Sequence, residues 1–193
     1  MTRNEPFLEP ILREMRLRRV ISHIPKNSVV LDVGCGSSAA FLKVISPHIK
    51  QGFGVDFKVE NTQFGNLKTT QLKLESNLPF EDATFDAVTM LAVLEHIEQE
   101  QQILREIHRV LVPGGKLILT VPSVWSQPIL EFLAYKLKIV SEAEIRDHKR
   151  YYNRKKLKKV LTKDNSFQEF NHQYFQLGMN NFCTVNKRSE YIV

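Results

Sequence analysis

The stretch Val29–Phe41, VVLDVGCGSSAAF, limits the possible folds of this chain more than any other. An apolar run leads directly into two glycines that flank Cys35, and small residues follow before the next apolar run. A buried strand that enters a glycine turn and then a helix is typical of a doubly wound α/β sheet. Glycines suit such a turn because the backbone must approach a ligand closely. The turn from Gly34 to Ser38 is therefore predicted to contact a ligand.

Strands and helices alternate over the following part of the chain. Apolar strand runs are predicted at 28–33, 52–57, 69–74, 85–91 and 116–122. Helices are predicted at 38–45 and 99–111, and the second ends near Pro113, which cannot continue a helix. This alternation predicts a Rossmann-like, doubly wound α/β fold whose sheet is mostly parallel and covered on both faces.

The last quarter of the chain has a different pattern. A helix is predicted at 154–163, and two strand runs follow at 166–178 and 180–187, joined by a tight turn near Gly178. Because the two strands of a hairpin run in opposite directions, one edge of the sheet is expected to be antiparallel.

The length of the chain favours a single domain. With 193 residues, 42% of them hydrophobic, it is long enough for one well-buried core and too short for two. We expect one domain over 1–193, with an N-terminal helix within 1–25 and an insertion at 124–165 that covers the substrate. Four apolar residues at helical spacing predict the N-terminal helix: Leu8, Ile11, Leu12 and Met15.

The composition suggests a reduced compartment. Cys35 and Cys183 are the only cysteines, too few for a disulfide framework, and no metal-ligand spacing is present. The sequence has no signal-peptide pattern and no stretch of about 20 apolar residues. We therefore expect a soluble, cytoplasmic protein without a transmembrane segment or a metal site.

Two carboxylates narrow the choice of ligand. Asp56 ends the second strand about 20 positions after Gly36, where an acid can accept hydrogen bonds from ribose hydroxyls. Up to this point NAD and other adenosine cofactors fit equally well. At the mouth of the turn, Asp32 would repel a pyrophosphate by roughly 4 kcal/mol at a separation of ~4 Å. It would attract S-adenosylmethionine, which carries an ammonium and a sulfonium and no phosphate. A local cap of the turn is the alternative role of Asp32.

Four segments also resemble a known family. VVLDVGCGSSAAF, GFGVDF, LPFEDATFDAVTMLAVLEHI and REIHRVLVPGGKLILTVPS occur in the order and spacing of class I S-adenosylmethionine-dependent methyltransferases. Within that class, the chain is similar to small-molecule and quinone-biosynthesis members. The resemblance covers about residues 28–123 and implies a seven-stranded sheet with an antiparallel last strand.

The resemblance also implies roles for individual residues. The turn after the first strand and Leu91 would face the methionine part of the cofactor, Asp56 the ribose, and Phe57 the adenine. Leu74 and Glu75 stand where the family often has an acid that meets the adenine amino group. The residues implied for cofactor binding are Asp32, Gly34, Cys35, Gly36, Asp56, Phe57, Leu74 and Leu91.

Methyl transfer from a sulfonium is a displacement on carbon, so the protein mainly aligns the acceptor about 3 to 3.5 Å from the methyl group. A hydroxyl or amine acceptor must also lose a proton, which suits a base of near-neutral pKa. His96 and His148 are the candidate bases, and Arg150 is expected to hold an anionic group of the acceptor. Alternatively, His96 orders the start of its helix and His148 lies in a solvated basic run.

The charge pattern leaves three interpretations. The formal charge is +6, the pI is near 9.3, and basic residues crowd the segment from Arg146 to Lys163. This run is either a solvated helix face, a patch for the phosphate of a nucleotide-linked or lipid-linked acceptor, or a nucleic-acid site. The segment DHKRYYNRKKLKKVL is also similar to part of the methyltransferases of polysaccharide and lipid-linked glycan pathways.

We therefore expect methyl transfer to an oxygen or nitrogen atom of a small acceptor that is anionic or lipid- or sugar-linked. Two alternatives stay open. One is a methyltransferase acting on RNA or another nucleic acid, which the absence of a recognition module makes the weaker of the two acceptor classes. The other is a protein that binds S-adenosylmethionine without catalysis.

Overall fold

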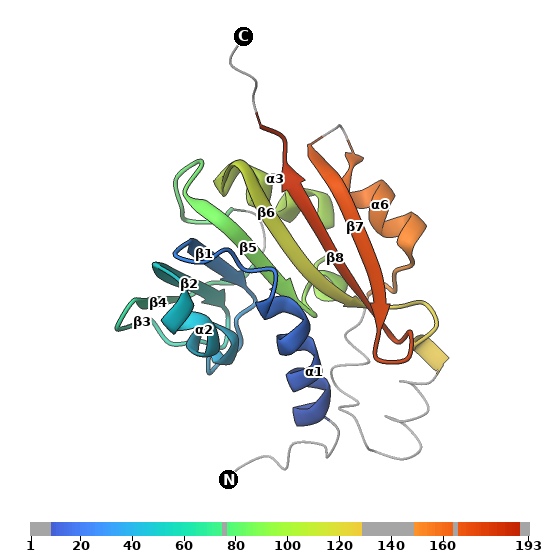
Figure 1. Ribbon diagram of the computed structural model, residues 1–193, viewed down its shortest axis with the longest axis horizontal. Coiled ribbons are helices and arrows are strands. Elements are labelled where there is room, and N and C mark those ends of the chain that lie inside the picture. The colour runs from blue at the N-terminus through green and yellow to red at the C-terminus, as the bar shows by residue number, and fades with distance from the viewer. Residues whose placement is uncertain (1–8, 75–76, 129–148, 164–165, 190–193) are drawn as a thin grey trace.

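The computed structural model describes residues 9–74, 77–128, 149–163 and 166–189. A sheet of eight strands forms its centre, in the order β3-β4-β2-β1-β5-β6-β8-β7 (Figure 1). The strands are β1 (Val29–Val33), β2 (Gln51–Asp56), β3 (Thr62–Phe64), β4 (Leu67–Gln71), β5 (Phe85–Leu91), β6 (Leu111–Pro122), β7 (Phe167–Phe175) and β8 (Asn180–Lys187). The helices are α1 (Glu9–Ile21), α2 (Ala40–Ile45), η1 (Ser46–His48), η2 (Leu94–His96), α3 (Glu100–Val110) and α6 (Arg154–Leu161).

The central strands are parallel. β1 pairs with β2 on one side and β5 on the other, and β4 and β6 extend the parallel part outward. β8 runs antiparallel to both β6 and β7, as the predicted hairpin requires. The expected mostly parallel, doubly wound fold is confirmed.

The sheet has one strand more than the seven expected. The additional strand is β3, which pairs antiparallel with β4 across a tight turn. Gly65 adopts a φ of 55° in that turn, which glycine tolerates at little cost. All three residues of β3 are exposed, so no apolar pattern marked this strand in the sequence.

Each face of the sheet carries its own hydrophobic core. On one face α3 contributes Ile103, Leu104, Ile107 and Val110, and α6 contributes Leu157 and Leu161. On the other face, α2 and the end of α1 pack with apolar residues of β1, β6 and β8. The helices therefore cover both faces, as an alternating chain requires.

Within the described ranges no helix is long and apolar enough to cross a membrane. In the same ranges, no group of three or more His, Cys, Asp and Glu side chains is placed to hold a metal ion.

Arg109, a residue of α3, holds the loop that precedes β5 against this helix. Its guanidinium donates to both carboxylate oxygens of Glu106 at 2.9 and 2.7 Å, and to Asp82 at 2.7 Å. It also donates to the carbonyl oxygens of Phe80 and Leu78 at 2.8 and 3.0 Å. Because one side chain bonds five acceptor atoms, the loop that leads into β5 depends on it.

We expect Arg109→Leu to lower the free energy of unfolding by about 2 to 3 kcal/mol, because charged hydrogen-bond partners lose their donor. The hydrogen bond from Arg109 holds the pKa of Glu106 below its usual 4.5. The difference in the free energy of unfolding between variant and wild type should therefore be complete above pH 4.5 and become smaller in more acidic solution. Denaturant unfolding across pH measures it, with the exposed Arg105→Leu on the same helix as control. Equal losses in both variants would contradict this role.

Candidate functional site

The carboxyl ends of β1, β2, β5 and β6 meet at one edge of the sheet because these strands are parallel. The segments that follow them lie at this edge: 34–38, 57–60, 92–97 and 123–128. β5 and β6 end in the lower part of Figure 1, where α1 also lies. In an open α/β sheet, ligands bind outside the carboxyl ends of the strands. This region, called the carboxyl edge below, is therefore the candidate site.

The two glycines of the turn after β1 serve different purposes. Gly34 has a φ of 79°, and a Cβ placed on it would lie 2.3 Å from Cγ2 of Val93. Gly34 thus makes room for the segment that follows β5. Gly36 has a φ of 69°, but no atom of the part of the chain that the structure describes lies within 4 Å of a Cβ placed on it. The space beside Gly36 is therefore open to a ligand.

Asp56 is held next to this open space. One of its carboxylate oxygens accepts a hydrogen bond from the Gly36 amide at 3.0 Å, and the other from the Lys58 amide at 2.7 Å. Each oxygen keeps a further lone pair for a hydroxyl donor. The neighbouring Phe57 is 59% exposed. A fixed carboxylate, an open glycine and an exposed aromatic ring form a cradle that fits the ribose and adenine of an adenosine cofactor.

Asp32 lies below the turn and not at its open mouth, because it is only 2% exposed. Its carboxylate accepts a hydrogen bond from the Thr89 hydroxyl at 2.6 Å. Burial raises the pKa of Asp32 to about 7, although the Thr89 hydrogen bond acts in the opposite direction and the charge of Asp56 adds to the rise. A cation bound nearby would favour the charged form of Asp32.

The remaining residues implied for the cofactor pack into the protein. Cys35 is buried, its sulfur lies 2.8 Å from a Cβ placed on Gly54, and burial raises the pKa of its thiol to about 12. The thiol is therefore neutral and fills the space behind the turn. Leu74 and Leu91 are half-buried and pack against the cores on opposite faces of the sheet. Glu75 lies outside the described residues. Cofactor contacts by these four residues stay predictions.

Of the two candidate bases, the structure describes one. His96 is half-buried in η2, directly after β5, and its amide donates to the Val93 carbonyl at 2.9 Å. It therefore lies at the carboxyl edge, as expected. His148 lies outside the described residues.

Arg150 makes its described contacts within the chain. Its guanidinium donates to the carbonyl oxygens of Ile97 and Glu98 and lies 3.8 Å from the carboxylate of Glu100. It binds the segment between η2 and α3, and its contact with an anionic acceptor stays a prediction. No pattern in the sequence indicated these contacts, because they join positions about 50 residues apart and local patterns do not reach that far.

Glu95 is the residue that sequence reasoning missed. It is 1% exposed, and its Oε2 atom is buried without a hydrogen-bond partner among the described residues. Burial raises the pKa of Glu95 to about 8, partly offset by the positive charge of Arg16 on α1. The Lys149 amide donates to the Glu95 carbonyl at 2.9 Å, and the Glu95 charge contributes to the raised pKa of Tyr152. A buried carboxyl group with one unsatisfied oxygen thus lies at the carboxyl edge, enclosed by α1 and the segment 149–152.

The signal in the sequence was a single acid inside the apolar run AVLEHI. A lone acid in such a run is most often exposed, and its burial here depends on α1 and on the segment that begins at Lys149.

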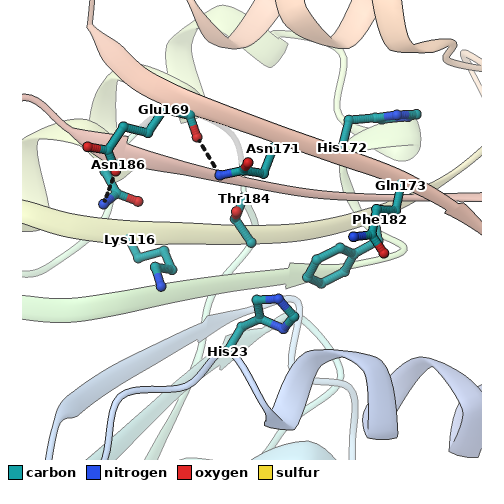
Figure 2. A pocket seen from close by; sticks show the side chains of 9 residues that line it. All are labelled: His23, Lys116, Glu169, Asn171, His172, Gln173, Phe182, Thr184 and Asn186. Atoms are coloured by element: carbon teal, nitrogen blue, oxygen red, sulfur yellow. Dashed lines mark hydrogen bonds between the residues drawn. The ribbon is translucent and has the colours of Figure 1, made fainter.

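Figure 2 shows the side chains that line a separate hollow on the face of β6, β8 and β7, beside the end of α1. The volume of this hollow is about 300 Å³. Glu169 accepts hydrogen bonds there from the side chains of Asn171 and Asn186, both at 3.0 Å. The hollow extends along the strands to Lys116, toward the amino end of β6, and away from the cradle at Gly36. Its lining residues are His23, Lys116, Glu169, Asn171, His172, Gln173, Phe182, Thr184 and Asn186.

Comparison with known proteins gives a consistent picture. A family model described as a methyltransferase domain matches residues 31–119. A demethylmenaquinone methyltransferase of Listeria monocytogenes is 31% identical over 156 residues, which cover 71% of this chain and 63% of the relative. A probable tRNA methyltransferase 9B of Bos taurus is 32% identical over 111 residues, which cover 55% of this chain and 24% of the relative.

A solved S-adenosylmethionine-dependent methyltransferase of Methanosarcina mazei has the same fold. Its TM-score is 0.63 at 21% identity, with 89% of this chain and 98% of that chain covered. The chain spans 49 to 63% of the length of the demethylmenaquinone methyltransferases that it matches.

The burial of Glu95 gives a test of stability. Because its pKa rises from 4.5 to about 8 on folding, the folded chain keeps the proton that the unfolded chain has lost. The stabilisation of the folded state that comes from this retained proton is complete below pH 4.5, and it is lost as the pH rises through about 8. At pH 9 we expect the free energy of unfolding of Glu95→Gln to exceed that of wild type by about 1 to 3 kcal/mol. Chemical denaturation at several pH values measures the difference.

Glu98→Gln is the matched control, since the Glu98 side chain is 77% exposed. It should leave the pH dependence of unfolding unchanged. Parallel pH curves for wild type and Glu95→Gln would show that Glu95 is not buried as a titrating group.

Proposed function

Since residues 31–119 form a class I S-adenosylmethionine-dependent methyltransferase domain, we propose that this chain transfers a methyl group to an oxygen or nitrogen atom of a small acceptor. The observation that carries the proposal is the Asp56 carboxylate, which the Gly36 amide fixes beside an open space. When bound, S-adenosylmethionine supplies a methyl group on a positively charged sulfur, which is a good leaving group.

The cradle after β1 and β2 would hold the cofactor. Asp56 would accept hydrogen bonds from the ribose hydroxyls, Phe57 would lie against the adenine, and the backbone beside Gly36 would adjoin the methionine part. Asp32 would attract the ammonium group from below the turn, because a cation relieves the cost of charging a buried carboxyl. The charges suit a cofactor without phosphate, since the Asp56 carboxylate lines the cradle and the Asp32 carboxyl lies below the turn.

The acceptor would bind on the other half of the carboxyl edge. There, η2 follows β5, and the described parts of the segment 124–165 run alongside, with Val124 donating to the Tyr152 carbonyl at 2.9 Å. α1 closes this region from one face, because Arg16 lies close enough to Glu95 to lower its pKa. We keep the segment 124–165 as the proposed cover of the acceptor.

The proposed chemistry needs one proton acceptor. The acceptor's O–H or N–H would pass its proton to a base while its lone pair forms the new bond to the methyl carbon, and the electron pair of the carbon–sulfur bond leaves with sulfur. Glu95 suits this role because a base with a pKa near the working pH is the most efficient. His96, its neighbour, and His148 are the other candidates.

The cradle can be tested with two matched glycine variants. Gly36 and Gly65 both have positive φ, and neither has an atom within 4 Å of a Cβ placed on it. Both alanine variants should therefore lose a similar amount of stability, about 1 kcal/mol from backbone strain. Only Gly36→Ala should weaken the binding of S-adenosylhomocysteine, by at least about tenfold, or 1.4 kcal/mol. Isothermal calorimetry measures the affinities.

An unchanged affinity in Gly36→Ala, or an equal loss in both variants, would refute the cradle. If the wild-type protein bound neither S-adenosylmethionine nor S-adenosylhomocysteine, the proposed function itself would be refuted.

The base can be identified once the acceptor has been found by metabolite co-purification and labelled-cofactor assays. Removing the base should lower kcat about 100- to 10,000-fold without changing cofactor affinity. We expect this of Glu95→Gln, and we expect the kcat of wild type to rise with pH up to about 8. His96→Gln and His148→Gln test the two histidines, and the exposed Glu98→Gln is the control.

A large loss in a histidine variant, with Glu95→Gln active, would transfer the role to that histidine.

A further inference from the structure

One corner of the molecule exposes large apolar side chains beside a row of cations. Trp125 follows β6 and is 69% exposed, and Leu177 in the turn between β7 and β8 is completely exposed. Tyr174, near the end of β7, is 43% exposed, and its hydroxyl accepts a hydrogen bond from the Arg154 amide at 3.4 Å. The end of β6, the β7–β8 turn and the start of α6 therefore meet at this corner (Figure 1).

The β7–β8 turn is held rigidly and in a strained conformation. Gln176 and Leu177 have φ values of 51° and 56°, which non-glycine residues rarely adopt. Three hydrogen bonds anchor the turn: Gln176 to the Leu12 carbonyl at 2.8 Å, and Ser123 to the carbonyls of Gly178 and Met179 at 2.6 and 2.8 Å. The structure thus fixes a leucine at the tip of the turn, where its side chain is completely exposed. Strain at an exposed position is typical of a functional surface.

α6 begins at this corner, because the Arg154 amide meets the Tyr174 hydroxyl, and the helix runs from there along β7 with its cations (Figure 1). Leu157 and Leu161 face the core, which leaves the opposite side of the helix to basic residues. Among the described residues, none of these basic side chains has a carboxylate within ion-pair distance. The exposed basic residues are Arg154, Lys155, Lys158, Lys159 and Lys163.

We infer that this corner, formed by Trp125, Tyr174, Leu177 and the basic side of α6, docks on an anionic lipid membrane surface. Lysine-rich segments are attracted to anionic headgroups, while tryptophan and leucine insert at the boundary of the acyl chains. The aliphatic tip at Leu177 decides against RNA, because a leucine side chain offers nothing to a phosphate backbone. The corner adjoins the carboxyl edge through Ser123 and Tyr152. If the proposed function holds, the acceptor is therefore a molecule carried in or on the membrane.

The chain carries its own reporter of docking, since Trp125 is its only tryptophan. The experiment uses the full chain without cofactor, so its outcome does not depend on the proposed methyl transfer. The probes are vesicles of phosphatidylcholine alone and vesicles in which about a third of the lipid is phosphatidylglycerol. With the anionic vesicles we expect the Trp125 emission to shift to the blue and to be quenched by brominated acyl chains. With phosphatidylcholine alone we expect neither change.

Two pairs of variants separate the apolar and charged parts. Leu177→Asp should weaken vesicle binding about tenfold. Its control is Phe64→Asp, which removes another exposed apolar side chain, 73% exposed, from β3 at the opposite edge of the sheet. Lys158→Glu with Lys159→Glu should weaken binding by about tenfold or more, whereas Lys43→Glu with Lys68→Glu, both exposed elsewhere, should not.

Unchanged Trp125 emission with anionic vesicles would overturn the proposal, and so would equal losses in the control variants. Binding of short RNA that is lost in the Lys158 and Lys159 double variant, without any vesicle binding, would assign the corner to nucleic acid instead. Calorimetry with S-adenosylhomocysteine on the same preparations tests the proposed function separately, because cofactor binding does not require the corner.

Discussion

The parallel pairing of β1 between β2 and β5 is the constraint on which the rest of the structure depends. Asp32 is in register with Gly54 on one side and Thr89 on the other, so the three strands end at the same edge. The turn after β1 is then tied to β2, because the Gly34 amide donates to the Val55 carbonyl at 2.8 Å. This attachment brings Gly36 to Asp56, and the cradle follows from the register of three strands without a dedicated loop or insertion.

Much of this could be predicted from the sequence, because apolar runs determine which segments are buried and glycines mark where the chain must turn. The central strands, the cradle residues and the antiparallel hairpin are of this kind. β3 could not be predicted, since all of its side chains are exposed. The depth of Asp32, the burial of Glu95 and the contacts of Arg150 were also beyond prediction. Each depends on segments about 50 or more residues away, and local patterns carry no information on such contacts.

Two buried acids at the carboxyl edge lower the stability of the free chain at neutral pH and above. Burial is the main reason for the raised pKa of both Asp32 and Glu95. A chain selected only for stability would carry neutral residues at these positions. Charging a buried carboxyl costs free energy, whereas a neutral side chain of similar shape fills the same space without that cost. Both costs would be relieved by ligands of the proposed kind, since a cation would favour the charge on Asp32 and an acceptor hydroxyl could hydrogen-bond the unsatisfied oxygen of Glu95.

The two halves of the carboxyl edge also differ in how they are built. The half proposed for the cofactor, here called the cofactor half, rests on the register of adjacent strands, which leaves little freedom to its geometry. The half proposed for the acceptor, here called the acceptor half, is closed by parts that come from both ends of the chain: α1, the segment 149–153 and the β7–β8 turn. Asn181 joins two of these parts, because its side chain donates to the Tyr152 carbonyl at 3.0 Å. Gln176 joins the turn to α1 in the same way. A membrane that contacts the β7–β8 turn would therefore lie close to the elements that enclose Glu95. Docking at Leu177 would then direct the acceptor half, and not the cofactor half, toward the membrane.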